Sequence, residues 1–240
     1  SRGLGDVYKR QALGCWTPVT TFGVGPGSDA DWRSELLRDD GTEFRLHHGN
    51  MEPLTIRWSQ CGLHNVENAI TALAAARHVG VSPAVAAEAL AGFGGVKRRL
   101  ELLATIADIA VYDDFAHHPT AIATTLQGLR ARNRAGRLIA LIEPRSNTMR
   151  MGEHRQQLAA ATAEADRVFW FQPPGMDWSL DSVVEHSRSP AELVGDIDVL
   201  AQKVAAQARP GDQVVIMSNG GFGGIHQKML AQLELNSSND

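Results

Sequence analysis

Residues 111–120 read VYDDFAHHPT, and this stretch decides the fold of the second half of the chain. Its apolar residues predict the end of a β-strand. Pro119 suits the first turn of a helix that Ile122, Leu126 and Leu129 continue at helical spacing. The stretch therefore predicts a strand-to-helix corner of an α/β sheet, the edge where ligands bind because loops and helix N-termini meet there.

Four titratable side chains crowd this corner: Asp113, Asp114, His117 and His118. One aspartate alone would be an ordinary helix cap, and one histidine an ordinary surface residue. The four together favour a functional site, because a carboxylate beside an imidazole orients the ring and changes its proton affinity. Capping by Asp113 or Asp114 remains the alternative interpretation.

Composition excludes several classes of protein. The 240 residues are 43% hydrophobic and 21% charged, which is enough for one large or two small globular domains. There are 23 Lys and Arg against 27 Asp and Glu, so we expect no nucleic-acid partner. Apolar runs are too short for membrane insertion. Cys15 and Cys61 form no ligand cluster, which predicts no metal site or disulfide framework and favours a reducing cytoplasm.

The first part of the chain is predicted to be one domain, residues 12–95. Residues 1–11 match none of the later patterns and are interpreted as a scar or foreign segment. From residue 12 the sequence reads as if it enters in mid-domain. Alternating apolar and polar residues at 17–22, 43–47 and 54–59, separated by turn signals, predict antiparallel strands.

Two helices are predicted after these strands. The first begins at the motif HNVEN, which would place His64, Asn65 and Asn68 on its first turn. One Asn would cap the helix, or both amides would face a nucleotide base, because each offers donors and an acceptor. Ser82 and Pro83 predict the start of the second helix.

A hinge is predicted where the glycines that end the second helix give way to VKRRLE at 96–101. Arg98 and Arg99 would either be solvated or reach phosphate or ribose with their planar guanidinium groups.

The second domain is predicted at 96–236, with a tail at 237–240. Strand and helix patterns alternate here, which predicts an α/β fold with a doubly wound, mainly parallel sheet. Strands are predicted at 102–106, 108–112, 137–142, 167–171 and 213–217, and helices from 119 onward and at 153–165, 199–208 and 224–235. Residues 173–189 show no assignable pattern.

Two further loops follow predicted strands, at the same edge as the Asp/His corner if the sheet is parallel. The loop at 143–152 reads EPRSNTMRMG, and its Arg145 suits bidentate recognition of a carboxylate. The loop at 218–226 reads SNGGFGGIH, and its glycines allow backbone N–H groups to approach an anion. It lacks the lysine of a phosphate loop. Polar crossovers without ligands remain the alternative.

Together these motifs resemble the Mur ligase family, the ATP-dependent amide-bond-forming ligases of the bacterial cell wall. The resemblance spans residues 14 to 235 and rests on HNxxN at 64–68, RRLE at 98–101, YDDFAHHPT at 112–120, EPRSNTM at 143–149 and SNGGFGGIHQK at 218–228. The last two motifs look specific to the recycling branch, which joins UDP-N-acetylmuramate to the tripeptide L-Ala-γ-D-Glu-meso-diaminopimelate. The chain resembles the end of the family's central ATPase domain and its C-terminal Rossmann-like domain.

The resemblance also implies cofactors and residue roles. ATP and Mg²⁺ would be the cofactors, with the magnesium ligands and the phosphate loop expected upstream, and a bacterial cytoplasmic location is implied. The implied roles are catalysis by Asp114 and His117, ATP binding by His64, Asn65, Asn68 and Arg99, and peptide binding by Arg145, Asn147, Thr148, Ser218 and Asn219. Without the phosphate loop and UDP-sugar domain, we expect the chain to be inactive alone. The alternatives are the sibling ligase that adds L-alanine, and a non-catalytic Rossmann-like module that binds an anion or peptide.

Overall fold

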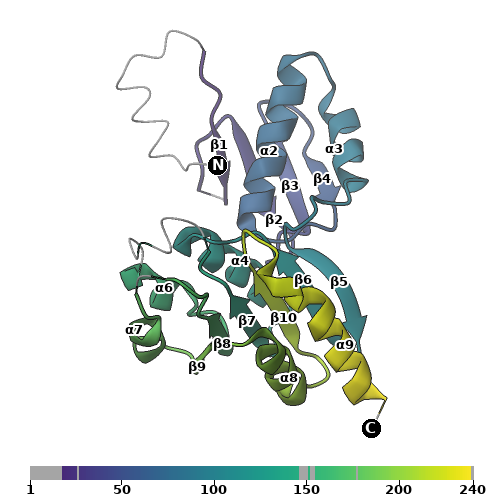
Figure 1. The fold of residues 1–240 in the computed structure, drawn as a ribbon. Helices are drawn as coiled ribbons and strands as arrows, with labels where there is room; N and C mark the ends of the chain where they lie inside the picture. The colour runs from purple at the N-terminus through teal and green to yellow at the C-terminus, as the bar shows by residue number, and fades with distance from the viewer. Residues whose placement is uncertain (1–17, 26, 146–150, 152–154, 177, 239–240) are drawn as a thin grey trace. The chain divides into compact units, whose positions relative to one another are not determined.

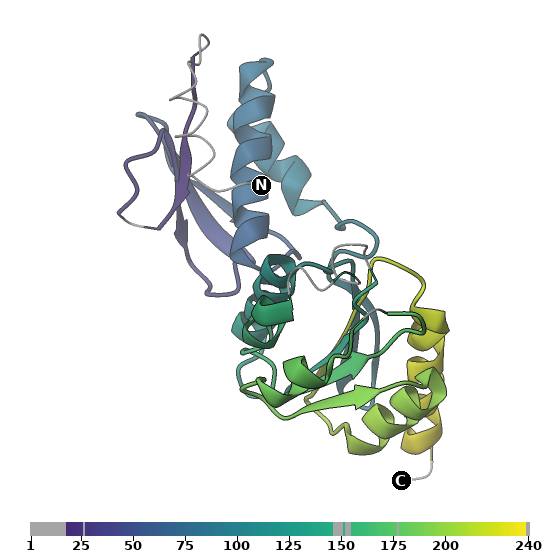
Figure 2. The same ribbon diagram turned by 60° about the vertical axis from the view of Figure 1, so that its left-hand side comes forward.

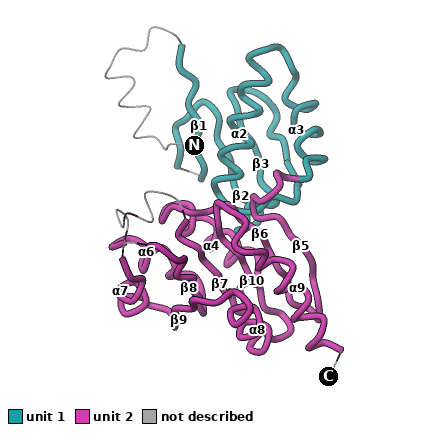
Figure 3. The backbone as a smooth tube through the Cα atoms, viewed as in Figure 1, with its two compact units in different colours: residues 1–94 teal, residues 95–240 magenta. Residues whose placement is uncertain are grey.

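The computed structural model describes residues 18–25, 27–145, 151, 155–176 and 178–238. The chain divides into two compact units, residues 1–94 and 95–240 (Figure 3). Each unit has a hydrophobic core of its own. No helix in the described ranges combines the length and apolar character that crossing a bilayer requires.

Unit 1 holds a four-stranded sheet in the order β1-β2-β3-β4. The strands are β1 (Phe22–Val24), β2 (Trp32–Leu36), β3 (Glu43–His48) and β4 (Leu54–Arg57). The antiparallel strands predicted at 43–47 and 54–59 are confirmed, but the prediction at 17–22 is wrong, because β1 begins at Phe22 and pairs in parallel with β2. Strand β2 was not predicted, because its inward-facing Ser34 is buried and breaks the apolar alternation.

Helices α2 (Leu63–His78) and α3 (Pro83–Ala91) complete unit 1. Both were predicted. The expectation of an asparagine cap on α2 is wrong: Gly62 is the N-cap and no side chain caps the helix. In α3, Ser82 Oγ accepts a hydrogen bond from the Val85 N–H and Pro83 occupies the first turn, as its fixed φ allows.

Unit 2 is built on a six-stranded sheet in the order β5-β6-β10-β7-β8-β9 (Figure 1). The strands are β5 (Glu101–Ile106), β6 (Ile109–Asp114), β7 (Leu138–Ile142), β8 (Arg167–Phe171), β9 (Ala191–Val194) and β10 (Gln213–Met217). β5 and β6 form an antiparallel hairpin, and all other neighbours are parallel. The predicted α/β sheet is therefore confirmed.

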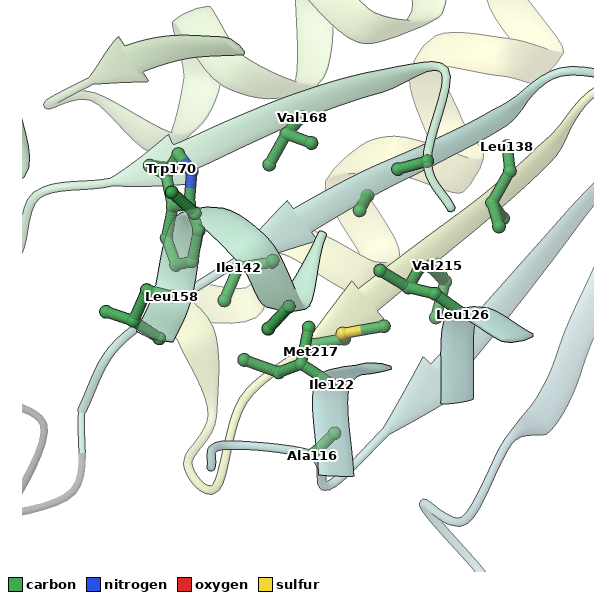
Figure 4. Packing of buried hydrophobic residues seen from close by; sticks show 14 of the residues in the cluster. Ala116, Ile122, Leu126, Leu138, Ile142, Leu158, Val168, Trp170, Val215 and Met217 are labelled. Carbon is green, nitrogen blue, oxygen red and sulfur yellow. The ribbon is translucent and has the colours of Figure 1, made fainter. Parts of the chain in front are cut away.

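Helices cover both faces of this sheet, as Figures 1 and 2 show. They are α4 (Pro119–Arg132), α6 (Arg155–Ala161) and α7 (Asp181–Glu185) on one face, and α8 (Ile197–Gln207), α9 (Ile225–Ser237) and the short 3-10 helix η1 (Phe222–Gly224) on the other. The central strand β7 shows the physical reason. Its side chains alternate between the two cores, Ile142 packing with α4 and α6 (Figure 4) and Leu141 with α8 and α9.

Two elements of unit 2 escaped prediction. The segment 173–189, which showed no pattern, contains α7, and β9 follows it. Both are too short to complete a periodic pattern that could be read from sequence. Helix α6 ends at Ala161, four residues before the predicted end.

Candidate functional site

The register of the central strands places three loops at one edge of unit 2. Met217, the last residue of β10, pairs with Asp114 of β6 on one side and with Ile142 of β7 on the other. Because these strands are parallel and end at the same level, the loops that follow them begin side by side. The expected edge is present. It contains the Asp/His corner, the start of the loop that follows β7 (Glu143, Pro144 and Arg145) and the glycine-rich loop at 218–226.

Asp113 is the centre of one polar network at this edge. Its Oδ2 accepts a hydrogen bond from Arg98 Nε at 3.1 Å, and its Oδ1 faces His226 Nε2 at 3.0 Å, an ion-pair distance without hydrogen-bond alignment. Burial raises the pKa of Asp113, but His226 and Arg98 outweigh it, so the pKa lies below its ordinary value. Arg98 Nη2 also donates to the carbonyls of Ser218 and Gly220, at 2.7 Å each.

Asp114 has different surroundings. Its two carboxylate oxygens accept hydrogen bonds from the backbone N–H groups of Leu100 and Ala116, both at 2.7 Å, and Thr125 Oγ1 lies 3.3 Å away. The side chain is buried, and this burial raises the pKa of Asp114 despite the hydrogen bonds it accepts. Asp114 therefore joins the backbone just before β5 to the backbone just after β6. Its catalytic role stays a prediction.

The RRLE segment is held in an uncommon conformation. Arg98 and Leu100 have φ of 60° and 51°, in the left-handed region that L-residues rarely occupy. A carboxylate accepts from each of their N–H groups, Glu101 for Arg98 and Asp114 for Leu100, both at 2.7 Å. The guanidinium groups of Arg98 and Arg99 lie 5.4 and 5.1 Å from the centre of the Phe115 ring. Strained backbone fixed by such contacts is typical of functional sites.

The two histidines of the corner differ in role. His118 is the N-cap of α4, its side chain accepting a hydrogen bond from the Thr120 N–H at 3.3 Å. The idea that an aspartate caps this helix is therefore wrong. His117 Nδ1 donates a hydrogen bond to the Phe115 carbonyl oxygen 2.8 Å away, so in a neutral ring the lone pair would stand on Nε2. His117 could thus accept a proton at Nε2.

Ser218 and Glu143 join the ends of β10 and β7. The Ser218 hydroxyl donates to Glu143 Oε2 at 2.5 Å and accepts from the Gly220 N–H at 2.9 Å. Both side chains are buried. Ser218 therefore shapes the glycine-rich loop from inside it.

Arg145 lies against that loop. Its side chain is exposed and packs so close to Gly220 that a Cβ there would collide with it. Across the described ranges, no carboxylate pairs with Arg145. Asn219 Oδ1, on the adjacent residue, is buried and has no hydrogen-bond partner in the described part of the chain. A cation and an unused acceptor on neighbouring segments could hold a carboxylate and an N–H group of one ligand.

The residues predicted to bind ATP fall in both units. His64 and Asn65 lie in the first turn of α2, while Asn68 lies beyond that turn and is exposed. Asn65 Nδ2 donates to the Cys61 carbonyl at 2.8 Å, which leaves its oxygen for other contacts. Arg99 belongs to unit 2. The ATP assignment stays a prediction.

Two residues that are predicted to bind the peptide, Asn147 and Thr148, lie outside the described residues.

Within the part of the chain that is described, no three His, Cys, Asp or Glu side chains come together as a metal site would require.

Four contributors to this edge are absent from the site residues that the family resemblance implied: Arg98, Asp113, Glu143 and His226. All four stand in the motifs already singled out, so their identity was visible. Their pairing was not, because Asp113 and His226 are far apart in sequence and meet only when α9 packs on the sheet.

The fold of unit 2 and the motifs at its edge define the class of protein. Residues 98–220, about half of the chain, match the family described as Mur ligase, glutamate ligase domain. The chain belongs to the Mur ligase family.

Individual proteins of this family are similar to the chain over most of its length. The chain is 46% identical over 226 residues to UDP-N-acetylmuramate–L-alanyl-gamma-D-glutamyl-meso-2,6-diaminoheptandioate ligase of Escherichia coli K12, covering 94% of this chain and 49% of that protein. It is 36% identical to UDP-N-acetylmuramate–L-alanine ligase of Mycobacterium sp. JLS, covering 90% and 47%. It resembles the crystal structure of murein peptide ligase mpl from Psychrobacter arcticus 273-4 with a TM-score of 0.69 and 42% identity, over 95% of this chain and 49% of that one. The chain thus spans about half the length of these relatives.

Proposed function

We propose that this chain is part of an ATP-dependent ligase of peptidoglycan recycling, which joins UDP-N-acetylmuramate to the tripeptide L-Ala-γ-D-Glu-meso-diaminopimelate in the bacterial cytoplasm. Residues 12–95 would belong to its central domain and residues 96–236 to its C-terminal domain. The higher identity to the tripeptide ligase, 46% against 36% for the L-alanine ligase, supports the tripeptide as acceptor.

The observation that carries the proposal is Arg145 beside the glycine-rich loop. The tripeptide is rich in carboxylates, and a guanidinium binds a carboxylate through two parallel N–H donors. Asn219 Oδ1, an acceptor without a partner, would receive an N–H of the peptide. Ser218 would act by holding the Gly220 N–H. Unit 2 would therefore bind the acceptor peptide.

The chemistry we propose is amide formation through an acyl phosphate. ATP would supply the phosphoryl group that activates the muramate carboxylate. The contacts we propose are those of Asn65 and Asn68 with adenine and, separately, of Arg99 with ribose or phosphate. The alanine amine of the peptide then displaces phosphate, and His117 Nε2 would take the proton that the amine releases. Asp114 would keep the corner in place through its backbone hydrogen bonds. The described residues hold no group of three His, Cys, Asp or Glu side chains, and we assign no step of the reaction to magnesium.

The first test is a calorimetric titration of the chain with the tripeptide and, separately, with L-alanine. We expect saturable binding of the tripeptide only, and a much weaker but still measurable affinity in Arg145→Ala. A matched control is Arg155→Ala, an exposed arginine at the start of α6. Binding of L-alanine instead would favour the sibling ligase. An unchanged tripeptide affinity in Arg145→Ala would contradict the role of this residue.

A second test concerns turnover. We expect no ATP-driven ligation by this chain alone, and measurable ADP release coupled to amide formation would contradict the proposal. The non-catalytic alternative makes a different prediction: tight ATP binding that is unchanged when Asn65 and Asn68 are both replaced by alanine.

A further inference from the structure

We propose that Gly220 is a positioning residue for Arg145: the absence of a side chain at position 220 is what seats the guanidinium against the glycine-rich loop. The inference that this seating sets the affinity for the peptide rests on the proposed function. The seating itself can be tested without any ligand.

The evidence is steric. A Cβ built on Gly220 would lie 2.6 Å from both Cδ and Cζ of Arg145, and closer still to Nη1. These are its nearest neighbours, and all belong to one side chain. Gly220 does not have the positive φ that makes glycine necessary for backbone reasons at Gly223 and Gly224. The small residue at 220 is therefore required by Arg145 and not by the turn.

The backbone of Gly220 has little freedom to yield. Its N–H donates to Ser218 Oγ at 2.9 Å, and its carbonyl accepts from Arg98 Nη2 at 2.7 Å. Arg98 is fixed in turn by Asp113. Arg145, in contrast, is exposed and has the flexible chain of any arginine. A methyl group at 220 would therefore displace Arg145 and leave the loop in place.

The displacement of the Arg145 guanidinium would be large enough to break its hydrogen bonds to a bound carboxylate. To reach ordinary van der Waals distance from a new methyl group, the Nη1 atom of the guanidinium must retreat by about 1.5 Å or more. Bidentate binding of a carboxylate depends on two aligned N–H groups. Such a shift would remove the alignment that the Arg145 N–H groups have before the ligand binds. We expect Gly220→Ala to weaken tripeptide binding about tenfold or more, on the scale of known misplacement effects.

Gly221 offers a matched control in the same loop. A Cβ on Gly221 would meet no atom within 4 Å, and its φ of −78° suits alanine. Gly221→Ala should therefore leave the position of the Arg145 side chain unchanged. The experiment compares the full chain with Gly220→Ala, Gly221→Ala, Arg145→Ala and the double variant Gly220→Ala/Arg145→Ala.

Two readouts separate this inference from the proposed function. The first is the ¹⁵N relaxation of the Arg145 Nε–H, identified by its loss in Arg145→Ala. We expect restricted motion in wild type and Gly221→Ala, and free motion in Gly220→Ala. Equal mobility in wild type and Gly220→Ala would overturn the inference, whether or not the tripeptide binds.

The second readout is tripeptide affinity, analysed as a double-mutant cycle. If Gly220 acts through Arg145, Gly220→Ala has no further effect once Arg145 is alanine. An equal penalty in both backgrounds would overturn the inference. Absence of tripeptide binding by the wild-type chain would instead count against the proposed function, while the relaxation experiment still decides the seating of Arg145.

Discussion

Replacing Asp114 with alanine removes the acceptor of two backbone N–H groups at once. The Leu100 and Ala116 N–H groups each donate to this carboxylate at 2.7 Å, and Leu100 holds a left-handed φ of 51°. Without the carboxylate, both donors lose their partner at the buried end of β6. The substitution should therefore loosen the backbone at the start of β5 and at the end of β6, independently of any catalytic role.

The magnitude follows from the two bonds. An N–H group left without its acceptor in a buried position costs about 1–3 kcal/mol, so two would cost about 2–6 kcal/mol. Part of this is offset, because burial raises the pKa of Asp114 and its removal relieves the cost of holding a desolvated charge. We expect Asp114→Ala to destabilise unit 2 by about 2–4 kcal/mol.

Amide hydrogen exchange read by mass spectrometry is the appropriate assay, because a chain of two units need not unfold in one step. Peptides from β6 and β10 should exchange faster in Asp114→Ala, while peptides from unit 1 should not change. The control is Asp198→Ala, which removes an exposed ion pair with Lys228 and should cost less than about 1 kcal/mol. Protection in β6 within about 0.5 kcal/mol of wild type would refute the reasoning.

Two other substitutions test the surroundings of the site. Asp113 has a pKa below its ordinary value of 3.8, so its contribution to stability is present above that pH and is lost as the pH falls through the folded pKa. In denaturation experiments, Asp113→Asn should therefore be less stable than wild type at pH 7, and the difference in unfolding free energy should shrink below pH 4. A difference that stays constant with pH would contradict this. Gly136→Ala would place its Cβ 3.0 Å from the backbone carbonyl carbon of Gly211, and closer still to the carbonyl oxygen, so we expect the free energy of unfolding to fall by about 2 kcal/mol or more. As a control, a Cβ at Gly195 would meet no atom within 4 Å, so Gly195→Ala should leave the melting temperature almost unchanged. Equal melting temperatures of the two variants would exclude the clash.

The strongest elements of unit 2 were readable because their pattern is complete within the element. All five residues of β7, LIALI, are buried, which is the composition of a strand covered on both faces. Pro119 occupies the first turn of α4, as its fixed φ favours. Where the pattern was short or broken, prediction failed, as in α7, β9 and β2.

In the candidate site, too, some features could be predicted from the sequence and others could not. The sequence by itself determined which residues stand at the sheet edge, because motifs that follow parallel strands reach the same edge in any such fold. It could not determine what each residue contacts. Asp113 and Asp114 are adjacent and chemically identical, yet one pairs with Arg98 and His226 while the other holds the N–H groups of Leu100 and Ala116.

Only the tertiary structure separates these two aspartates, and the reason is the pleat of β6. Successive side chains of a strand point to opposite faces. Asp113 follows Val111 to the face covered by α8 and α9, where His226 lies, and Asp114 follows Tyr112 to the face covered by α4, where Thr125 lies. The seating of Arg145 on Gly220 was equally invisible, because it depends on β7 and β10 being neighbours in the sheet although many residues separate them in the chain.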